Sequence, residues 1–231
     1  MKLSTVILVA IFSLLTATVL TAKPGVISGI VRAEGRNEVE QSGAGGKYDS
    51  RKYKFVERIN YEELRDFVVF IEGRTRNELR VAEISQSVLT QKDAIFRPHV
   101  LPVYLGTTVK WPNQDDIFHN VFSMSEPKQF DLGLYKGSPA EKAIKFDKAG
   151  RVDVFCSIHS AMHCIILVLE NPYFALADES GRYVIKNVPP GNYQLKAWHE
   201  RLPPQTQDIT VTEASTLKVD FTLGIRNLPK Y

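Results

Sequence analysis

Three residues with metal-ligating side chains lie close together in one short stretch of the sequence. Cys156, His159 and Met162 follow the spacing Cys-x2-His-x2-Met. They come where an alternating run ends and immediately before a second apolar run, residues 165–169. A thiolate, an imidazole and a thioether on one loop form a soft, compact half-site, and copper is the metal that these atoms suit.

A further ligand has to come from a distant part of the chain, and His119 is the candidate. Strand alternation predicts that His119 shares a face with Ile117 and Val121, and that Cys156 points inward beyond two core valines of its own strand. Both strands would then direct their ligands to the inside of one end of a β-sandwich. Two histidines and a cysteine with a weak axial methionine form the ligand set of a blue-copper electron-transfer site.

The residue types leave two alternatives open in this stretch. Cys156 and Cys164 are the two cysteines of the chain, and a disulfide between them is the simpler interpretation for an exported protein. His163 could also ligate the metal in place of Met162, which would give a harder, more tetragonal copper site or a zinc site. Neighbouring residues of a strand face opposite sides, so His163 and Met162 are not both expected to reach one ion.

Segments 109–113, 119–121 and 156–162 together resemble a cupredoxin of the amicyanin and plastocyanin kind, over residues 80–170. The loop with two residues between histidine and methionine is most similar to that of amicyanin. The resemblance implies one mononuclear copper ion, held by His119, Cys156, His159 and Met162. It also implies that Asn120 ties the copper-binding strands together by hydrogen bonds.

The same resemblance implies a route for the electron. In such proteins the ring edge of the loop histidine is exposed within a small apolar patch. For this chain, His159 would be the exit, surrounded by Ile158, Ala161 and Met162.

A second resemblance appears in the last part of the chain. The segments 178–183, Asp-x-x-Gly-Arg-Tyr, and 189–193, Pro-Pro-Gly-x-Tyr, are similar to the carboxypeptidase regulatory-like (transthyretin-like) β-sandwich. This resemblance implies a fold and an interaction surface, and no catalysis. After Pro172 the chain reaches these motifs almost at once, so the usual opening strands of such a domain are missing there.

Two earlier segments, 25–31 and 67–73, have the pattern of those missing strands. We therefore predict a second sandwich split between residues 24–73 and 172–225, with the copper domain inserted near residues 73–79 and 170–172. The alternative is sequential, with the early strands in the cupredoxin sheet. Either arrangement gives an all-β protein: a cupredoxin Greek-key β-sandwich plus a second immunoglobulin- or prealbumin-like β-sandwich.

The remaining segments carry less information. Residues 1–22 have a basic start, an apolar middle and small residues at the exit, which is typical of a signal peptide or, if uncleaved, a signal anchor. Residues 35–60 are predicted to form a long surface loop, and Asn60 to cap a short helical turn over 61–65. His99 and His199 have no ligand-type neighbours in sequence and are expected to be structural or surface residues.

Composition and motifs exclude several functions. A formal net charge of +3 over 231 residues gives no argument for nucleic acid, and no triad, paired carboxylates or phosphate-binding glycine loop supports an enzyme. If protein side chains also occupy all coordination positions of the metal, no open position remains for a substrate. We expect a periplasmic or extracellular one-electron carrier between redox partners such as a cytochrome or a dehydrogenase, membrane-bound only if the N-terminal segment is uncleaved. The alternative is a non-redox copper-handling or partner-docking protein.

Overall fold

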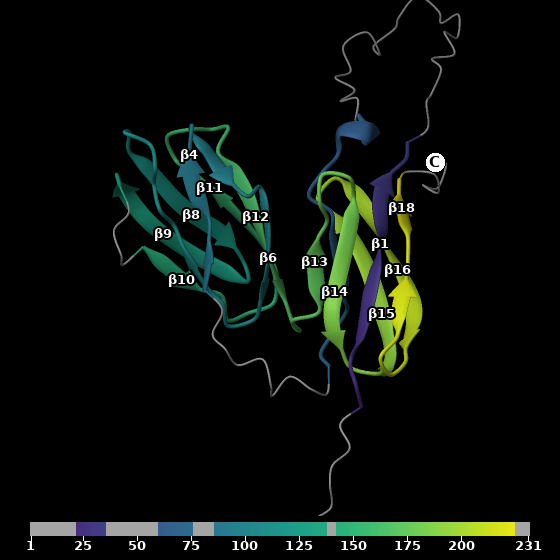
Figure 1. Cartoon of the computed structure of the whole chain (residues 1–231). Coiled ribbons are helices and arrows are strands. Elements are labelled where there is room, and N and C mark those ends of the chain that lie inside the picture. Colours follow the sequence, from purple (N-terminus) through teal and green to yellow (C-terminus); the bar gives the residue numbers. More distant parts are fainter. Residues whose placement is uncertain (1–21, 36–59, 76–85, 138–141, 225–231) are drawn as a thin grey trace, which may run out of the picture.

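The computed structural model describes residues 22–35, 60–75, 86–137 and 142–224, which form two β-sandwiches (Figure 1). The predicted all-β class is confirmed, because the described residues contain strands and a single 3-10 turn. The predicted export segment and surface loop lie outside the described residues, apart from Ala22, Gly35 and Asn60. Within the described ranges, no helix is long and apolar enough to cross a membrane.

The first sandwich contains the predicted metal ligands. Its main sheet has the strand order β6 (Val100–Tyr104), β12 (His163–Leu169), β11 (Gly150–Phe155), β8 (His119–Ser125) and β9 (Lys128–Tyr135). A smaller sheet has the order β10 (Ala143–Lys145), β7 (Thr108–Lys110) and β3 (Gln86–Val88), beside the hairpin of β4 (Thr90–Lys92) and β5 (Ile95–Arg97). Their shared core is apolar and includes Val109, Trp111, Phe146, Val152 and Val154.

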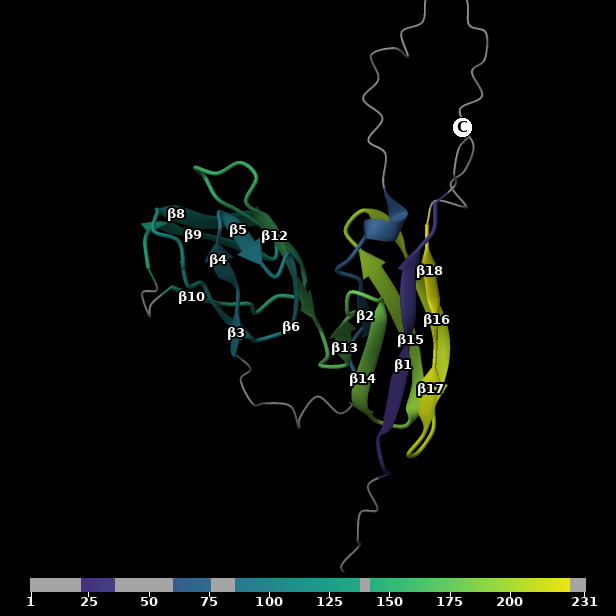
Figure 2. The ribbon, with the colours of Figure 1, turned by 45° about the horizontal axis from the view of Figure 1, so that its top comes forward.

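The second sandwich is built from both ends of the chain. One sheet has the order β14 (Arg182–Val188), β1 (Gly25–Ala33) and β17 (Thr216–Lys218), and β18 (Phe221–Leu223) also pairs with β1. The other has the order β13 (Phe174–Leu176), β2 (Val68–Ile71), β15 (Gly191–His199) and β16 (Leu202–Val211). In Figures 1 and 2 the purple β1 therefore lies among the green and yellow strands of the C-terminal part.

The strand pairing places the first sandwich between the two parts of the second. β1 pairs with β14, β17 and β18, and β2 pairs with β13 and β15. Gly29 makes this pairing possible, because a Cβ at this position would lie 1.7 Å from the carbonyl oxygen of Val219. Within the described residues, all ladder partners of β1 and β2 lie between 174 and 223.

The chain leaves the second sandwich and returns to it at neighbouring points. The side-chain nitrogen of Asn171, just after β12, donates to the backbone carbonyl oxygens of Ile71 and Gly73, at 2.7 and 2.6 Å. The Asn171 side-chain oxygen accepts from the backbone of Tyr173 at 2.9 Å. One buried side chain thus closes the junction by satisfying three backbone groups.

β12 is buried on both faces, which explains its continuous apolar sequence. Its even-numbered residues Cys164, Ile166 and Val168 belong to the core of the first sandwich. Its odd-numbered residues pack in a separate apolar cluster between the two sandwiches, together with side chains from β2, β6, β13 and β15: Ile165, Leu167, Leu169, Val68, Val100, Phe70, Phe174 and Trp198. The two sandwiches therefore share an apolar interface.

The predicted helical turn is present in a shorter form. It is a 3-10 turn over Tyr61–Glu63, and the side chain of Asn60 accepts a hydrogen bond from the backbone of Glu62 at 3.2 Å. Asn60 is the N-cap, as the sequence predicts.

The shared interface makes a prediction about stability. Ile165 is fully buried in it, so Ile165→Ala should reduce the free energy of unfolding by about 2–5 kcal/mol. Ile95→Ala is the matched control: Ile95 is 49% exposed in β5, and its truncation should change stability by about 0.5 kcal/mol or less. Urea unfolding of both variants measures the difference. Equal losses would contradict the interface.

Candidate metal centre

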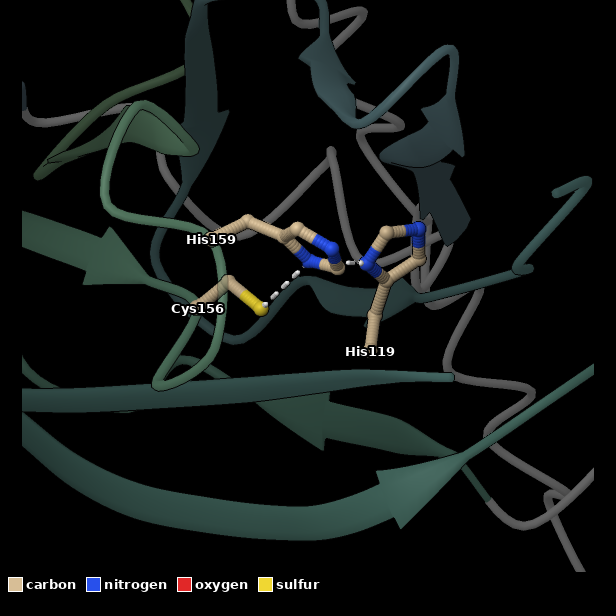
Figure 3. Close-up of side chains that lie close together, drawn as sticks. All are labelled: His119, Cys156 and His159. Atoms are coloured by element: carbon tan, nitrogen blue, oxygen red, sulfur yellow. Dashed lines mark hydrogen bonds between the residues drawn. The ribbon is translucent and has the colours of Figure 1, made fainter. Parts of the chain in front are cut away.

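Three of the four predicted ligands lie together at one end of the first sandwich (Figure 3). The Nδ1 atoms of His119 and His159 are 3.0 Å apart, and the Cys156 Sγ is 3.6 Å from the His159 Nδ1. Donor atoms at these separations can share one ion, since metal–nitrogen and metal–sulfur bonds are about 2.0–2.3 Å long. The rings meet edge to face, with centroids 4.8 Å apart.

The elements that carry these residues fix their positions. His119 is the first residue of β8 and is fully buried, and Cys156 directly follows β11. The loop after Cys156 is closed by two backbone hydrogen bonds. Met162 donates to the carbonyl oxygen of His159 at 3.0 Å, and Cys156 donates to that of Met162 at 3.3 Å. His159 lies in this loop and is partly exposed.

Met162 is the last residue of the loop, directly before β12. It is buried and belongs to the same apolar cluster as Cys156. His163, the next residue, faces the other way, and its Nε2 is 2.9 Å from an Asp153 carboxylate oxygen. Strand alternation therefore gives Met162 the inward position and places His163 outside the cluster.

Both cysteines are free thiols in the structure, so the disulfide alternative does not describe it. Cys164 lies on β12, fully buried in the core of the first sandwich. Burial, reinforced by the Asp153 carboxylate, raises the pKa of the Cys164 thiol well above its ordinary value. A protonated, enclosed thiol is an inert core residue, whereas Cys156 faces two imidazoles.

Asp115 orients His119 from the side opposite the cluster. Its carboxylate lies 2.8 Å from the His119 Nε2, and it also accepts from the backbone nitrogens of Asp93 and Ala94, at 2.7 and 2.9 Å. Burial alone would raise the pKa of Asp115, but these hydrogen bonds outweigh it and lower the pKa, so the group is ionised at neutral pH. When the Nε2–H of the ring donates a hydrogen bond to this carboxylate, the Nδ1 lone pair is left directed at the cluster, an arrangement common to histidine ligands.

Asn113 holds the loop that carries Asp115. Its side-chain nitrogen donates to the carbonyl oxygens of Ile117 and Tyr135, at 2.9 and 3.2 Å, and its oxygen accepts from the Asp115 backbone at 2.9 Å. The roles of Asp115 and Asn113 were not predicted from the sequence. The sequence shows only an acidic residue four positions before a candidate ligand, and in a loop this spacing does not determine where the carboxylate points.

Two expectations for the surroundings of His119 were wrong. The Asn120 amide donates to Asp131 at 2.5 Å, so it joins β8 to the ligand-free β9 rather than joining the copper-binding strands. The reason is alternation, because Asn120 follows an inward ligand and faces the other side of the sheet. Ile117 precedes β8 and is 47% exposed, so it does not share the buried face of His119 and Val121.

The expected apolar patch around His159 is present in part. Ile158 is 52% exposed and Ala161 is also exposed. Met162 is buried and contributes no surface, because its side chain packs in the core.

The two histidines that were expected to be structural or surface residues, His199 and His99, lie in different surroundings. His199 is buried beside the ring of Phe67 and accepts from the Arg201 backbone at 3.1 Å, so it is structural as expected. Burial lowers its pKa and keeps the ring neutral. His99 instead lies in a second group of ligand-type side chains, with His163 and Glu200.

Comparisons with known proteins give matches to both parts of the chain. The family model of the carboxypeptidase regulatory-like domain matches residues 168–224. Among curated proteins, no sequence matches that of this chain.

Solved structures that are similar to part of this chain include the following three. A copper-containing nitrite reductase from Thermus scotoductus SA-01 has 26% identity and a TM-score of 0.35, over 37% of this chain and 23% of that chain. This chain therefore corresponds to less than a quarter of the length of that reductase. A purple cupredoxin from Nitrosopumilus maritimus has 21% identity and a TM-score of 0.30, over 36% and 98% of the two chains. A reduced Cu(I) form of a mutant amicyanin has 21% identity and a TM-score of 0.32, over 43% and 97%.

At these TM-scores, the class of the first sandwich rests on its strand pairing and on the order of its ligands. The chain combines a cupredoxin-like domain, which groups His119, Cys156 and His159 at one end and buries Met162 in its core, and a carboxypeptidase regulatory-like domain. The family model confirms the resemblance to the carboxypeptidase regulatory-like domain over residues 168–224. The strand pairing and the grouping of His119, Cys156 and His159 agree with the cupredoxin resemblance.

The hydrogen bond from Asp115 to His119 gives a test of the cluster. Asp115→Asn weakens the partner of Nε2, and loss of such a partner typically lowers metal affinity about 10- to 100-fold. Copper(II) affinity, measured by competition with a chelator, should fall by this amount. Asp116→Asn is the matched control, because Asp116 is exposed and pairs with Lys136. Equal affinities of the two variants would show that Asp115 does not support the ligand.

Proposed function

We propose that this protein is an exported blue (type 1) copper protein that carries single electrons between redox partners. The observation that carries the proposal is the convergence of His119, Cys156 and His159, with Met162 buried in the same apolar cluster as Cys156. Two imidazoles, a thiolate and a thioether would hold one copper ion, which supplies a one-electron redox couple when bound. This donor set fits copper better than zinc, which rarely uses a thioether.

The surroundings of the cluster suit an electron carrier. Asp115 fixes the ring of His119, and backbone hydrogen bonds close the loop that carries Cys156 and His159. Ligands held in place before the ion arrives need little movement when its charge changes. Protein side chains fill the ligand set and leave no open position for a substrate, which favours a carrier over an enzyme.

Replacement of the thiolate tests the copper assignment. Copper bound through Cys156 should absorb strongly in the visible range and give a type 1 electron paramagnetic resonance spectrum. Cys156→Ser should abolish the visible band, because the sulfur-to-copper transition is lost. Cys164→Ala is the matched control and should keep the band, since Cys164 lies in the core away from the imidazoles. A band that survives Cys156→Ser would overturn the proposal.

The exposed surface of the loop suits brief contact with a redox protein such as a cytochrome or a dehydrogenase. His159 reaches the surface next to Ile158 and Ala161. Electron-transfer encounters use small contact areas and must dissociate quickly. His159 would thus be the exit for the electron.

A charge placed on this surface should slow electron exchange. Ala161→Asp should reduce the electron self-exchange rate, measured by NMR on mixed oxidised and reduced protein, because two copies would meet like charge to like charge. The visible spectrum should stay unchanged. Ala214→Asp adds the same charge at an exposed turn of the second sandwich and serves as the control. Equal rates for the two variants would exclude this face as the exit.

The proposed location is the periplasm or the extracellular space. The support is the signal-like sequence of residues 1–22, and membrane attachment would follow only if that segment stayed uncleaved. The non-redox alternative, a copper-handling or docking protein, would lack the intense visible band.

A further inference from the structure

We propose that His99, His163 and Glu200 form a second metal site, which binds a divalent ion of the zinc and copper(II) kind and joins the two sandwiches. One ligand-type atom from each residue lies within 4.8 Å of the others. His99 and His163 belong to the copper-binding sandwich, and Glu200 belongs to the turn between β15 and β16 of the second one. The site is separate from the cluster of His119, Cys156 and His159.

The two histidines are brought together by a parallel strand pair. His99 directly precedes β6, and its carbonyl oxygen accepts from the backbone of Ile165 in β12 at 2.8 Å. The rings of His99 and His163 meet edge to face, with centroids 5.5 Å apart. Glu200 approaches from the second sandwich, and its carboxylate lies 2.9 Å from the His99 Nε2.

Each histidine has one nitrogen occupied by an acceptor that is not among the three ligand-type atoms of the group. The His99 Nδ1 is 3.3 Å from the carbonyl oxygen of His163, and the His163 Nε2 is 2.9 Å from an Asp153 oxygen. Protons on these two nitrogens leave lone pairs on the His99 Nε2 and the His163 Nδ1. Histidine ligands commonly have this pattern, in which an outer carboxylate or carbonyl fixes the tautomer.

Asp153 is well suited to the outer position. Arg151 holds both of its carboxylate oxygens, at 2.7 and 2.9 Å. A carboxylate held on both oxygens in this way is a firm acceptor for the His163 ring.

The contact between His99 and Glu200 needs either a proton or a metal ion between the two facing atoms. If His99 is neutral with its proton on Nδ1, the Nε2 lone pair faces a carboxylate oxygen at 2.9 Å, and two acceptors repel each other. A proton on Nε2 would relieve this repulsion, either as a hydrogen bond from the other neutral tautomer or as an ion pair from the doubly protonated ring. A metal ion would relieve it as well, and would also use the adjacent lone pair of His163, which an ion pair leaves unused.

The donor set and its exposure define the class of ion. Two imidazoles and a carboxylate without sulfur suit zinc and copper(II), not the softer copper(I). The side chains of His99, Glu200 and His163 are 36%, 22% and 27% exposed, so an ion can enter and water can complete its coordination. A bound ion would fasten the turn after β15 to the start of β12, beside the apolar interface.

Zinc titration of the full chain tests the site. The background is the double variant Cys156→Ser, His159→Ala, which disables the first cluster, so the result does not depend on the proposed electron carrier. One Zn²⁺ should bind per chain by isothermal titration calorimetry and raise the melting temperature. Glu200→Gln, which is nearly isosteric, and His99→Ala should each abolish this binding. Asp153→Asn should weaken it about 10- to 100-fold.

Glu179→Gln is the control, an exposed carboxylate at another turn of the second sandwich, and it should bind Zn²⁺ normally. Copper(II) at the same site should give a tetragonal electron paramagnetic resonance spectrum without an intense visible band, because no thiolate is present. Absence of Zn²⁺ binding in the background variant would overturn the proposal. Binding that is unchanged by both Glu200→Gln and His99→Ala would also overturn it and leave a plain ion pair between His99 and Glu200.

Discussion

The structure depends on the burial of both faces of one strand, β12. Alternate residues of this strand enter two different apolar clusters, one inside the first sandwich and one between the sandwiches. A shift of one residue would exchange these two sets of side chains, so the register is strongly fixed. The loop ligands come immediately before β12, and this register determines that Met162 faces the core and that His163 faces away.

The arrangement of the side chains of His119, Cys156 and His159 follows from the pairing of the strands around them. β11 and β12 pair with Phe155 opposite His163, and β11 pairs with β8 with Phe155 opposite Phe122. These ladders bring the start of β8 to the loop that follows β11, so His119 meets Cys156 and His159. The loop that carries Asp115 lies outside the strands, and the Asn113 side chain fixes it. A buried polar network thus completes what strand pairing begins.

The parts of the structure that could be predicted from sequence are those encoded by local spacing. The ligand types, the apolar run of β12 and the missing opening strands of the second sandwich are all visible in short segments. Asp115 was missed because a loop, not a periodic element, directs its carboxylate to His119. Asn120 was assigned wrongly because a residue after an inward ligand faces the other side of its strand. His99 was judged to be alone because its partner Glu200 lies 101 residues away, in the other sandwich.

The chain enters and leaves the inserted sandwich at neighbouring backbone positions, which Asn171 joins. This connection alone would allow the inserted sandwich to be removed or exchanged as a unit. The apolar face of β12 limits that independence. If the insert were deleted, the second sandwich could keep its own ladders, but it would expose Val68, Phe174 and Trp198 to water. Isolated as a separate protein, the insert would expose its half of the same surface. Either domain could therefore combine with a new partner domain only after its apolar surface residues had changed. The two domains must then evolve together, although the chain connects them at a single pair of neighbouring positions.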